Sequence, residues 1–260
     1  MAKSRDKKRA DELVFAQGLA ETRNKAQALI MASKIQWING EKLETVKKPG
    51  QQFSVDVQFQ ISGAVDNDVS RGAKKLRGAL LDWPEIKKQI SSGQCLDIGA
   101  STGGFTQVLL ECGAKKVLDV DVGTHQLHER IRRDPRVYCV EKQHVLKIDD
   151  TFWRETKIDP FFEVIVTDVS FISVTKLVDF VASCLKPGAS WLVLVKPQFE
   201  LDASKAPGGI VKEELYRKMA LENVLDKIAE NATLEVVASA DSKLAGAKGN
   251  LEFFLWVKKQ

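Results

Sequence analysis

In the second half of the chain, three charged residues lie beside apolar runs that would form the water-excluding interior of a sheet. Asp168 follows the run VIVT, Lys196 follows WLVLV, and Glu252 interrupts LEFFLW. Burying an isolated charge is costly, so these groups must pair with one another or with a ligand. Asp168 and Lys196 would end parallel strands, where open sheets bind ligands. If the last strand runs antiparallel at or near the sheet edge, Glu252 joins them.

A glycine-rich turn forms the second candidate site. The strand that ends in Asp97-Ile98-Gly99 runs into ASTGGF, and Asp121 ends the next strand 24 residues after Asp97. A doubly wound fold places a ribose-binding acid there. Ser101 replaces the second glycine of the dinucleotide motif, which disfavours NAD and flavins and favours S-adenosylmethionine, a cofactor without phosphate. The predicted cofactor site comprises Asp97, Gly99, Ala100, Ser101, Thr102, Gly103, Gly104, Phe105, Asp121, Val122 and Asp168.

The elements that must position these residues are short strands alternating with amphipathic segments from Gln94 onward. This alternation predicts a Rossmann-like, doubly wound α/β domain with a mostly parallel sheet covered on both faces. The seven predicted strands are CLDIG, KVLDVDV, VYCVE, EVIVTDVS, WLVLVKPQ, LEVVASAD and EFFLWVKK.

The first sixty residues predict a separate, small α+β unit. Helices are expected over 10–17 and 23–32, the second capped by Thr22. Asn39-Gly40 suits a hairpin turn, and alternating apolar residues predict one half-buried strand from Phe53 to Phe59. The polar segment SGAVDND marks a linker, so we expect domains at 1–63 and 64–260.

The excess positive charge lies in this front unit. Residues 1–60 carry 11 Lys or Arg against 7 Asp or Glu, whereas the rest of the chain carries 28 of each. A basic arm followed by a polar helix face is typical of a surface that binds RNA phosphates and riboses. The predicted RNA-binding residues are Arg5, Lys7, Lys8, Arg9, Arg23, Asn24 and Gln27.

The composition of the chain sets limits on its class. With 260 residues, 44% hydrophobic and 28% charged, disorder is excluded as the main state. The apolar runs fall far short of the roughly 18–20 residues that cross a bilayer, and the basic start lacks an apolar signal-peptide core. We expect a cytoplasmic protein with no membrane partner and four reduced cysteines. His125 and His128 have no partners that would complete a metal site, so no metal is expected.

Two resemblances join these features. Residues 9–61, with GLAETRNKAQALIMASKIQWINGEKL followed by KPG, resemble the S4-type RNA-binding domain. Behind it, SRGAKKL, LDIGASTGGFT, VDVG, TDVSFIS, LVKPQFE and GNLEFF occur in an order that resembles the TlyA (hemolysin A) family of ribosomal RNA 2′-O-methyltransferases, whose catalytic domain is FtsJ-like. The resemblance implies an S-adenosylmethionine-dependent enzyme that methylates a ribose, that of cytidine, in ribosomal RNA, with ribosomal subunits as partners.

The resemblance also implies a catalytic Lys-Asp-Lys-Glu tetrad. It falls on Lys75, Asp168, Lys196 and Glu252, three of which are the charged residues singled out above. Lys75 is chosen over Lys74 because it directly precedes the leucine of the motif. We assign Lys196 as the acceptor of the hydroxyl proton, Asp168 and Lys75 as its orienting partners, and Glu252 as the group that fixes a lysine or the ribose. Because Asp168 favours the ammonium form of Lys196, the sequence leaves open which of the two lysines is neutral.

Two other classes of function compete with this interpretation. A noncatalytic RNA-binding or ribosome-assembly factor would need neither the glycine-rich turn nor the charge cluster. The hemolysin name suggests a membrane-active protein, but a chain without a span or a strongly basic amphipathic helix offers no physical basis for pore formation.

Overall fold

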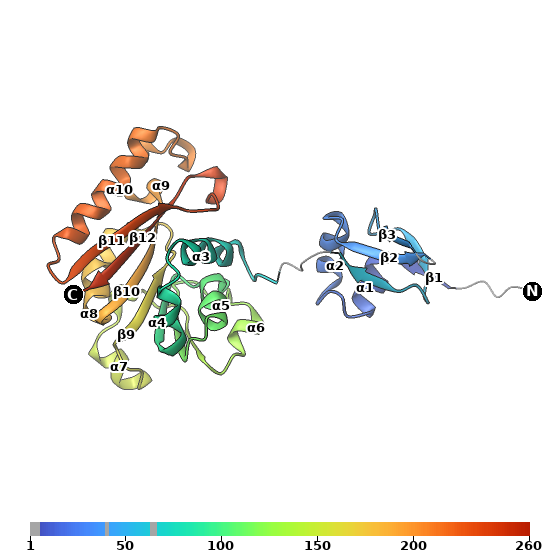
Figure 1. The fold of residues 1–260 in the computed structure, drawn as a ribbon, viewed down its shortest axis with the longest axis horizontal. Coiled ribbons are helices and arrows are strands. Elements are labelled where there is room, and N and C mark those ends of the chain that lie inside the picture. The colour runs from blue at the N-terminus through green and yellow to red at the C-terminus, as the bar shows by residue number, and fades with distance from the viewer. Residues whose placement is uncertain (1–5, 40–41, 63–66) are drawn as a thin grey trace, which may run out of the picture. The chain divides into compact units, whose positions relative to one another are not determined.

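The computed structural model describes residues 6–39, 42–62 and 67–260 (Figure 1). The chain divides into two compact units, Met1–Asn67 and Asp68–Gln260. Arg5 of the predicted basic arm and Gly40 of the predicted hairpin turn lie outside the described residues.

The front unit packs two helices against short antiparallel strands around a small apolar core. Thr22 caps the second helix as predicted, accepting a hydrogen bond from the Lys25 N–H at 3.1 Å. The core gathers Leu13, Ile30 and Phe53. The elements are β1 (Lys7–Arg9), α1 (Ala10–Ala16), α2 (Arg23–Met31), β2 (Ile35–Asn39), β3 (Lys42–Thr45), β4 (Gln52–Ser54) and β5 (Phe59–Ile61).

The predicted single strand from Phe53 to Phe59 is wrong. β4 pairs with β1 and β5 pairs with β2, and the chain turns between them, with the Val57 N–H donating to the Ser54 carbonyl at 3.0 Å. The Gln17 side chain accounts for the break. Its amide donates to the Val57 carbonyl at 2.7 Å and accepts from the Phe59 N–H at 3.0 Å. The end of α1 thus satisfies backbone groups that a continuous strand would have paired.

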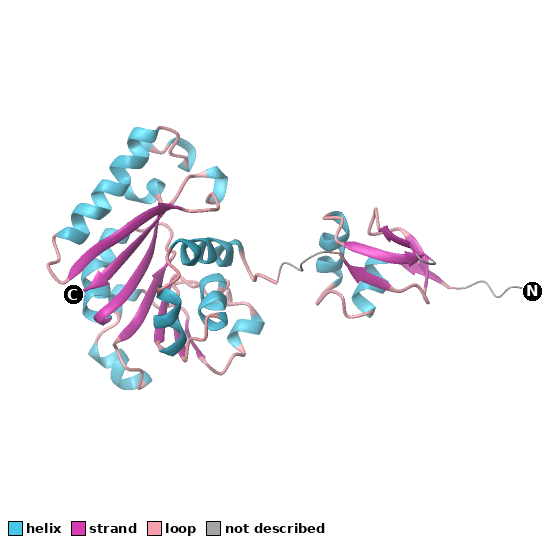
Figure 2. Cartoon of the chain, in the orientation of Figure 1, coloured by secondary structure: helices cyan, strands magenta, loops and turns pink. Residues whose placement is uncertain are grey.

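The second unit is built on a seven-stranded sheet with the order β11-β12-β10-β9-β6-β7-β8, and all seven predicted strands are confirmed (Figure 2). β12 runs opposite in direction to the other six strands of this sheet, which are parallel to one another. The strands are β6 (Gln94–Ile98), β7 (Lys116–Val120), β8 (Val137–Val140), β9 (Phe162–Thr167), β10 (Leu185–Val195), β11 (Leu234–Asp241) and β12 (Phe253–Lys259).

Helices cover both faces of this sheet, as the alternating sequence pattern predicts (Figure 1). One face packs against α3 (Arg71–Asp82), α4 (Ile86–Ser92), α5 (Gly104–Glu111) and α6 (Glu129–Arg132). The other packs against α7 (Asp150–Thr156), α8 (Val178–Cys184) and α10 (Glu214–Ala229). The remaining α-helix of this unit is α9 (Pro197–Glu200), and the 3₁₀ turns are η1 (Val145–Lys147), η2 (Val174–Leu177), η3 (Ala203–Lys205), η4 (Pro207–Gly209) and η5 (Ala247–Gly249).

The topology of the sheet determines where a ligand binds. From β6 the chain proceeds outward through β7 and β8, then returns to place β9 on the other side of β6. Ligands of open α/β sheets bind outside the carboxyl ends of the strands at such a switch point. Among the described residues, no helix is long and apolar enough to cross a membrane.

Candidate active site

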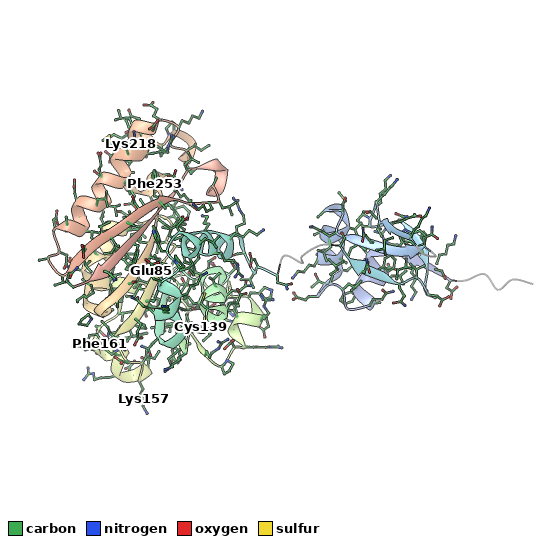
Figure 3. All side chains as sticks on the ribbon, in the orientation of Figure 1. Glu85, Cys139, Lys157, Phe161, Lys218 and Phe253 are labelled. Carbon is green, nitrogen blue, oxygen red and sulfur yellow. The ribbon has the colours of Figure 1, made fainter. Side chains whose placement is uncertain are left out.

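Strand register brings the three charged strand residues to one end of the sheet. Val195, the last residue of β10, pairs with Phe253, the first residue of β12. Lys196 follows Val195 and Glu252 precedes Phe253, so both lie at the same end of this strand pair. Phe253 is labelled at the start of β12 in Figure 3. Asp168 follows β9, and its N–H donates to the Ile98 carbonyl of β6 at 3.0 Å. The antiparallel direction of β12 is what returns Glu252 to the carboxyl ends of the parallel strands.

Two ion pairs form at this end of the sheet. Lys196 Nζ lies 2.6 Å from Asp168 Oδ1, and Lys75 Nζ, from α3, lies 2.5 Å from Glu252 Oε2. Lys75, Lys196 and Glu252 are buried, at 8%, 8% and 3% exposure, whereas Lys74 is exposed. The structure therefore brings the four predicted catalytic residues into one cluster, with Lys75 rather than Lys74 turned inward.

The charge of Glu252 depends on this cluster. Burial raises the pKa of its carboxyl above the usual range, while Lys75 and, more weakly, Lys196 act to lower it. The two ion pairs are neighbours, because Lys196 and Glu252 flank the paired residues Val195 and Phe253. Gly246 makes room for the carboxylate, because a Cβ at that position would lie 1.9 Å from Glu252 Oε1.

Two glycines of the predicted cofactor turn serve the same cluster. A Cβ on Gly99 would lie 2.7 Å from the Asp168 carbonyl oxygen, so glycine lets β6 and the end of β9 approach. A Cβ on Gly104 would lie 2.2 Å from Ser70 Oγ and 2.8 Å from the Ala73 nitrogen. Gly104 thus allows α3, which carries Lys75, to pack against the start of α5.

Two cavities share the walls of the glycine-rich turn. The larger has a volume of about 510 Å³, within the range of small-molecule sites. A second, of about 350 Å³, reaches Lys196 and the start of α3. Both are lined by Gly99, Ser101, Asp168 and Ser170; Asp121 and Val122 line the first, and Ala100, Thr102, Gly104 and Phe105 line the second. Gly103 lines neither of these two cavities.

Asp121 holds the larger cavity in shape. Its two carboxylate oxygens accept the N–H groups of Ser101 at 2.8 Å and Gly123 at 2.7 Å. Each oxygen keeps a further lone pair that can accept a ribose hydroxyl. The cavity offers backbone, carboxylate and apolar walls that include Val120 and Leu177, with no Lys or Arg among its lining residues. This chemistry fits S-adenosylmethionine, which has a ribose and an adenine but no phosphate.

Asp97 does not line either of these two cavities, and its contact with the cofactor remains a prediction. Its side chain is fully buried beneath the turn. Thr106 Oγ1 lies 2.7 Å from Asp97 Oδ2 and 2.8 Å from Asp119 Oδ1. A hydroxyl has one proton to donate, so the second contact requires a protonated carboxyl. Burial accordingly raises the pKa of Asp97 to about 7 and that of Asp119 well above its usual range.

Comparison with known proteins agrees with this geometry. Residues 69–259 match the model of the FtsJ-like methyltransferase family. The chain belongs to that family. It is 39% identical over 249 residues to hemolysin A of Brachyspira hyodysenteriae, covering 94% of this chain and 97% of the relative. It is 35% identical over 253 residues to the 16S/23S rRNA (cytidine-2′-O)-methyltransferase TlyA of Mycobacterium tuberculosis, covering 97% and 90%.

A solved structure of a hemolysin candidate from Streptococcus thermophilus superposes with a TM-score of 0.70 at 34% identity, covering 99% of this chain and 90% of that one. These matches confirm the predicted TlyA and hemolysin A family, the methyltransferase fold and the S-adenosylmethionine dependence.

Beside this methyltransferase site lie residues that sequence reasoning did not single out. Ser170 Oγ accepts a hydrogen bond from Lys196 Nζ at 3.0 Å. Phe171 is 92% exposed with φ +67°, and its ring centroid lies 5.3 Å from that of Phe199. The loop after Asp168 reads VSFIS, so Phe171 is one of three apolar residues in it and the sequence pattern did not distinguish it. Nothing in the local pattern distinguished Ser170.

The front unit contains a cluster built on Asp11, a carboxylate that sequence reasoning also missed. Asp11 is fully buried and accepts from Arg9 Nε at 2.9 Å, Arg23 Nε at 3.2 Å and Gln27 Nε2 at 2.6 Å. The Arg9 hydrogen bond is the main cause that holds the pKa of Asp11 far below its usual range. Arg9, Arg23 and Gln27 each donate to Asp11, so their predicted contact with RNA, which remains a prediction, would have to use the donors that Asp11 leaves.

Proposed function

We propose that this protein transfers a methyl group from S-adenosylmethionine to the 2′-oxygen of a cytidine ribose in ribosomal RNA. The observation that carries the proposal is the pairing of Lys196 with Asp168, and of Lys75 with Glu252, beside the cavity at the switch point. The similarity to the 16S/23S rRNA (cytidine-2′-O)-methyltransferase TlyA of Mycobacterium tuberculosis supports this substrate class. Ribosomal RNA within a ribosomal subunit is the proposed form of the substrate.

The tetrad suits a reaction that needs alignment and one proton transfer. S-adenosylmethionine supplies a methyl group made electrophilic by its sulfonium, and the ribose hydroxyl is a poor nucleophile that gains most from in-line positioning. A new oxygen–carbon bond forms as the carbon–sulfur bond breaks, and the hydroxyl proton must leave. Lys196 lines the second cavity and is the proposed acceptor of that proton; because the ammonium paired with Asp168 has no lone pair, Lys196 must lose a proton before it can accept the one from the hydroxyl.

The partners of Lys196 fix the direction of its amine. Asp168 lies 2.6 Å and Ser170 3.0 Å from Nζ, and the Phe199 ring lies 5.9 Å away. The ion pair with Asp168 and the hydrogen bond to Ser170 together restrict the position of Nζ, and a third hydrogen-bonding position of the amine is left for a substrate hydroxyl. Lys75 and Glu252 form the second pair, which we propose orients the ribose.

Phe171 is the proposed support for the target base. It is 92% exposed, it lines the larger cavity, and it follows directly after Ser170. A solvent-exposed aromatic ring of this kind loses water-exposed apolar area when a base stacks on it, and such stacking contributes about 1–3 kcal/mol per base. Chemistry on a ribose or base within folded RNA requires that the nucleotide leave its stack.

The front unit is the proposed RNA-binding domain of S4 type. Lys7, Lys8 and Asn24 are exposed, and Asp11 holds Arg9 and Arg23 in fixed orientations. Fixed guanidinium groups lose less conformational entropy when they bind phosphates.

The test is to map 2′-O-methyl groups in ribosomal RNA from cells with and without the protein, beside a tritiated-methyl assay on purified ribosomal subunits. Wild-type protein should methylate cytidine, and Lys196→Ala should lose about 10²–10⁴-fold in rate while it still binds cofactor. Lys218→Ala, on the far surface of α10, is the matched control (Figure 3). A noncatalytic RNA-binding factor would leave the methylation map unchanged, and that result would reject the proposal.

A further inference from the structure

Asn250 is a buried polar residue that the tetrad does not include. It is 3% exposed and precedes Glu252 by two positions. Its carboxamide makes two hydrogen bonds to a distant segment of the chain. Oδ1 accepts from the Val211 N–H at 2.9 Å, and Nδ2 donates to the Gly209 carbonyl at 2.8 Å. A buried amide that satisfies two backbone groups in this way fixes the relative position of the two segments.

The segment that Asn250 holds begins at the proposed base. From Lys196 the chain passes through α9 to η3 and η4, where Gly208 and Gly209 both have positive φ. Lys248 Nζ donates to the Gly208 carbonyl at 3.0 Å and so provides a second link to the same turn. The route from Lys196 therefore returns to the strand segment that carries Glu252.

The turn is also positively charged on its outer side. Lys212 and Lys248 are exposed, and Lys205 lies 5.8 Å from the ring of Tyr216. Exposed lysines on a turn attached to the active-site segment suit contact with an RNA backbone.

We infer that Asn250 is a positioning residue for methyl transfer: its carboxamide ties the lysine-flanked turn at Pro207–Gly209 to the segment that carries Glu252, so RNA bound on the turn is held in register with the tetrad. This inference rests on the proposed methyl transfer to RNA. Asn250 does not touch the reacting atoms and acts through the turn and through Glu252.

The experiment compares Asn250→Asp, Asn250→Ala and Lys248→Ala in the full-length protein. Rates of methyl transfer to ribosomal subunits are measured at saturating and limiting RNA, beside S-adenosylmethionine affinity and thermal melts. Asn250→Asp keeps the acceptor for Val211 but, when ionised, cannot donate to Gly209. We expect kcat to fall about 10²-fold at pH 8, the scale of a small misplacement at a reacting centre, with cofactor affinity within twofold of wild type. Lys248→Ala should raise the KM for RNA several-fold.

A dependence on pH separates positioning from simple loss of structure. Protonation of the Asn250→Asp side chain restores a donor, so its kcat should approach wild type as pH falls, whereas the deficit of Asn250→Ala should not change with pH. Asn231→Ala removes an exposed, local turn contact to Thr233, after α10 and away from the tetrad, and should keep the wild-type kcat.

The outcomes distinguish a failed positioning role from a failed proposed function. The inference would be overturned if folded Asn250→Asp kept the wild-type kcat at pH 8 and Lys248→Ala kept the wild-type KM. It would also be overturned if the variants lost cofactor binding in parallel with kcat. If Asn250→Ala does not fold, the other two variants decide, because one is nearly isosteric and the other alters an exposed side chain. A wild-type protein that fails to methylate RNA would instead reject the proposed function.

Discussion

Lys75 Nζ lies 2.5 Å from Glu252 Oε2, although 177 positions separate the two residues along the chain. Their side chains are 9% and 2% exposed, so each charge depends on the other. Removing one partner of a buried ion pair leaves an uncompensated charge, whereas replacing both by apolar residues restores balance.

Substitution of this pair should therefore separate stability from activity. Lys75→Met should lower the free energy of unfolding by about 3–5 kcal/mol, and adding Glu252→Leu should recover most of that loss. Both variants should be inactive in methyl transfer, because both remove tetrad groups. Urea denaturation beside the tritiated-methyl assay measures the two effects. Equal stability of the single variant and wild type would show that the pair is not buried as described.

Gly246→Ala tests the packing around Glu252 directly. The added Cβ would meet Glu252 Oε1 at 1.9 Å, so the carboxylate must move away from Lys75. We expect a loss of about 10²-fold in kcat, since small misplacements at a reacting centre have effects of this size. Gly188→Ala is the control, because nothing lies within 4 Å of its added Cβ, although its positive φ costs about 1 kcal/mol of stability. Equal kcat in the two variants would contradict the expectation.

Asp119→Asn should change how stability depends on pH. The pKa values of Asp97 and Asp119 are raised, chiefly because burial disfavours their charged forms. The charges of Asp168 and Asp121 raise the pKa of Asp97 further. The charge of Arg132 acts to lower the pKa of Asp119. The folded state then binds more protons than the unfolded state, so stability falls as pH rises from about 4 through 7.

The Asp119→Asn side chain can donate to Thr106 without a titrating proton. The substitution should make the free energy of unfolding fall less steeply as pH rises, and should raise that free energy at pH 8 by about 1–3 kcal/mol. Urea midpoints at several pH values measure this, with the exposed Asp241→Asn as control. Parallel pH profiles for wild type and Asp119→Asn would count against a shared proton.

Asp121→Ala should weaken cofactor binding. The substitution removes the proposed ribose acceptor and releases the N–H groups of Ser101 and Gly123. Hydrogen bonds to a charged group contribute about 1.5–3 kcal/mol, so the Kd for S-adenosylmethionine should rise about 10-fold to 150-fold in calorimetry. NAD should not bind the wild-type protein. Tight NAD binding would overturn the assignment of the cavity, and Asp226→Ala on the surface of α10 should leave the Kd unchanged.

Lys7→Ala combined with Lys8→Ala should reduce RNA affinity and its salt dependence. Each lost phosphate contact lowers the slope of log affinity against log salt by about 1. Filter binding to ribosomal RNA across a salt series measures the slope, with Lys218→Ala in the catalytic unit as control. A slope that stays at the wild-type value would leave the front unit without its proposed role.

The sequence by itself determined the architecture of the larger unit and the cofactor it uses. Seven alternating apolar segments specify seven strands because burial on both faces requires continuous apolar runs, and Ser101 with Asp121 distinguishes the cofactor class by local chemistry. Charged residues at the ends of Val164–Thr167 and Trp191–Val195 were recognisable because dry strands do not tolerate unpaired charges.

Only the tertiary structure decided which of these groups meet. The choice between Lys74 and Lys75 depends on which face α3 turns to Glu252, and that depends on close packing at Gly104. Asp97 lies in the expected motif, but its side chain faces Thr106 and Asp119 beneath the turn. Side chains alternate between the two faces of a strand, and the register of β7 beside β6 places Asp119 next to Asp97. In the front unit, Asp11 engages Gln27, 16 positions away. Contacts between residues far apart in sequence leave no periodic signal, so they emerge only when the chain is folded.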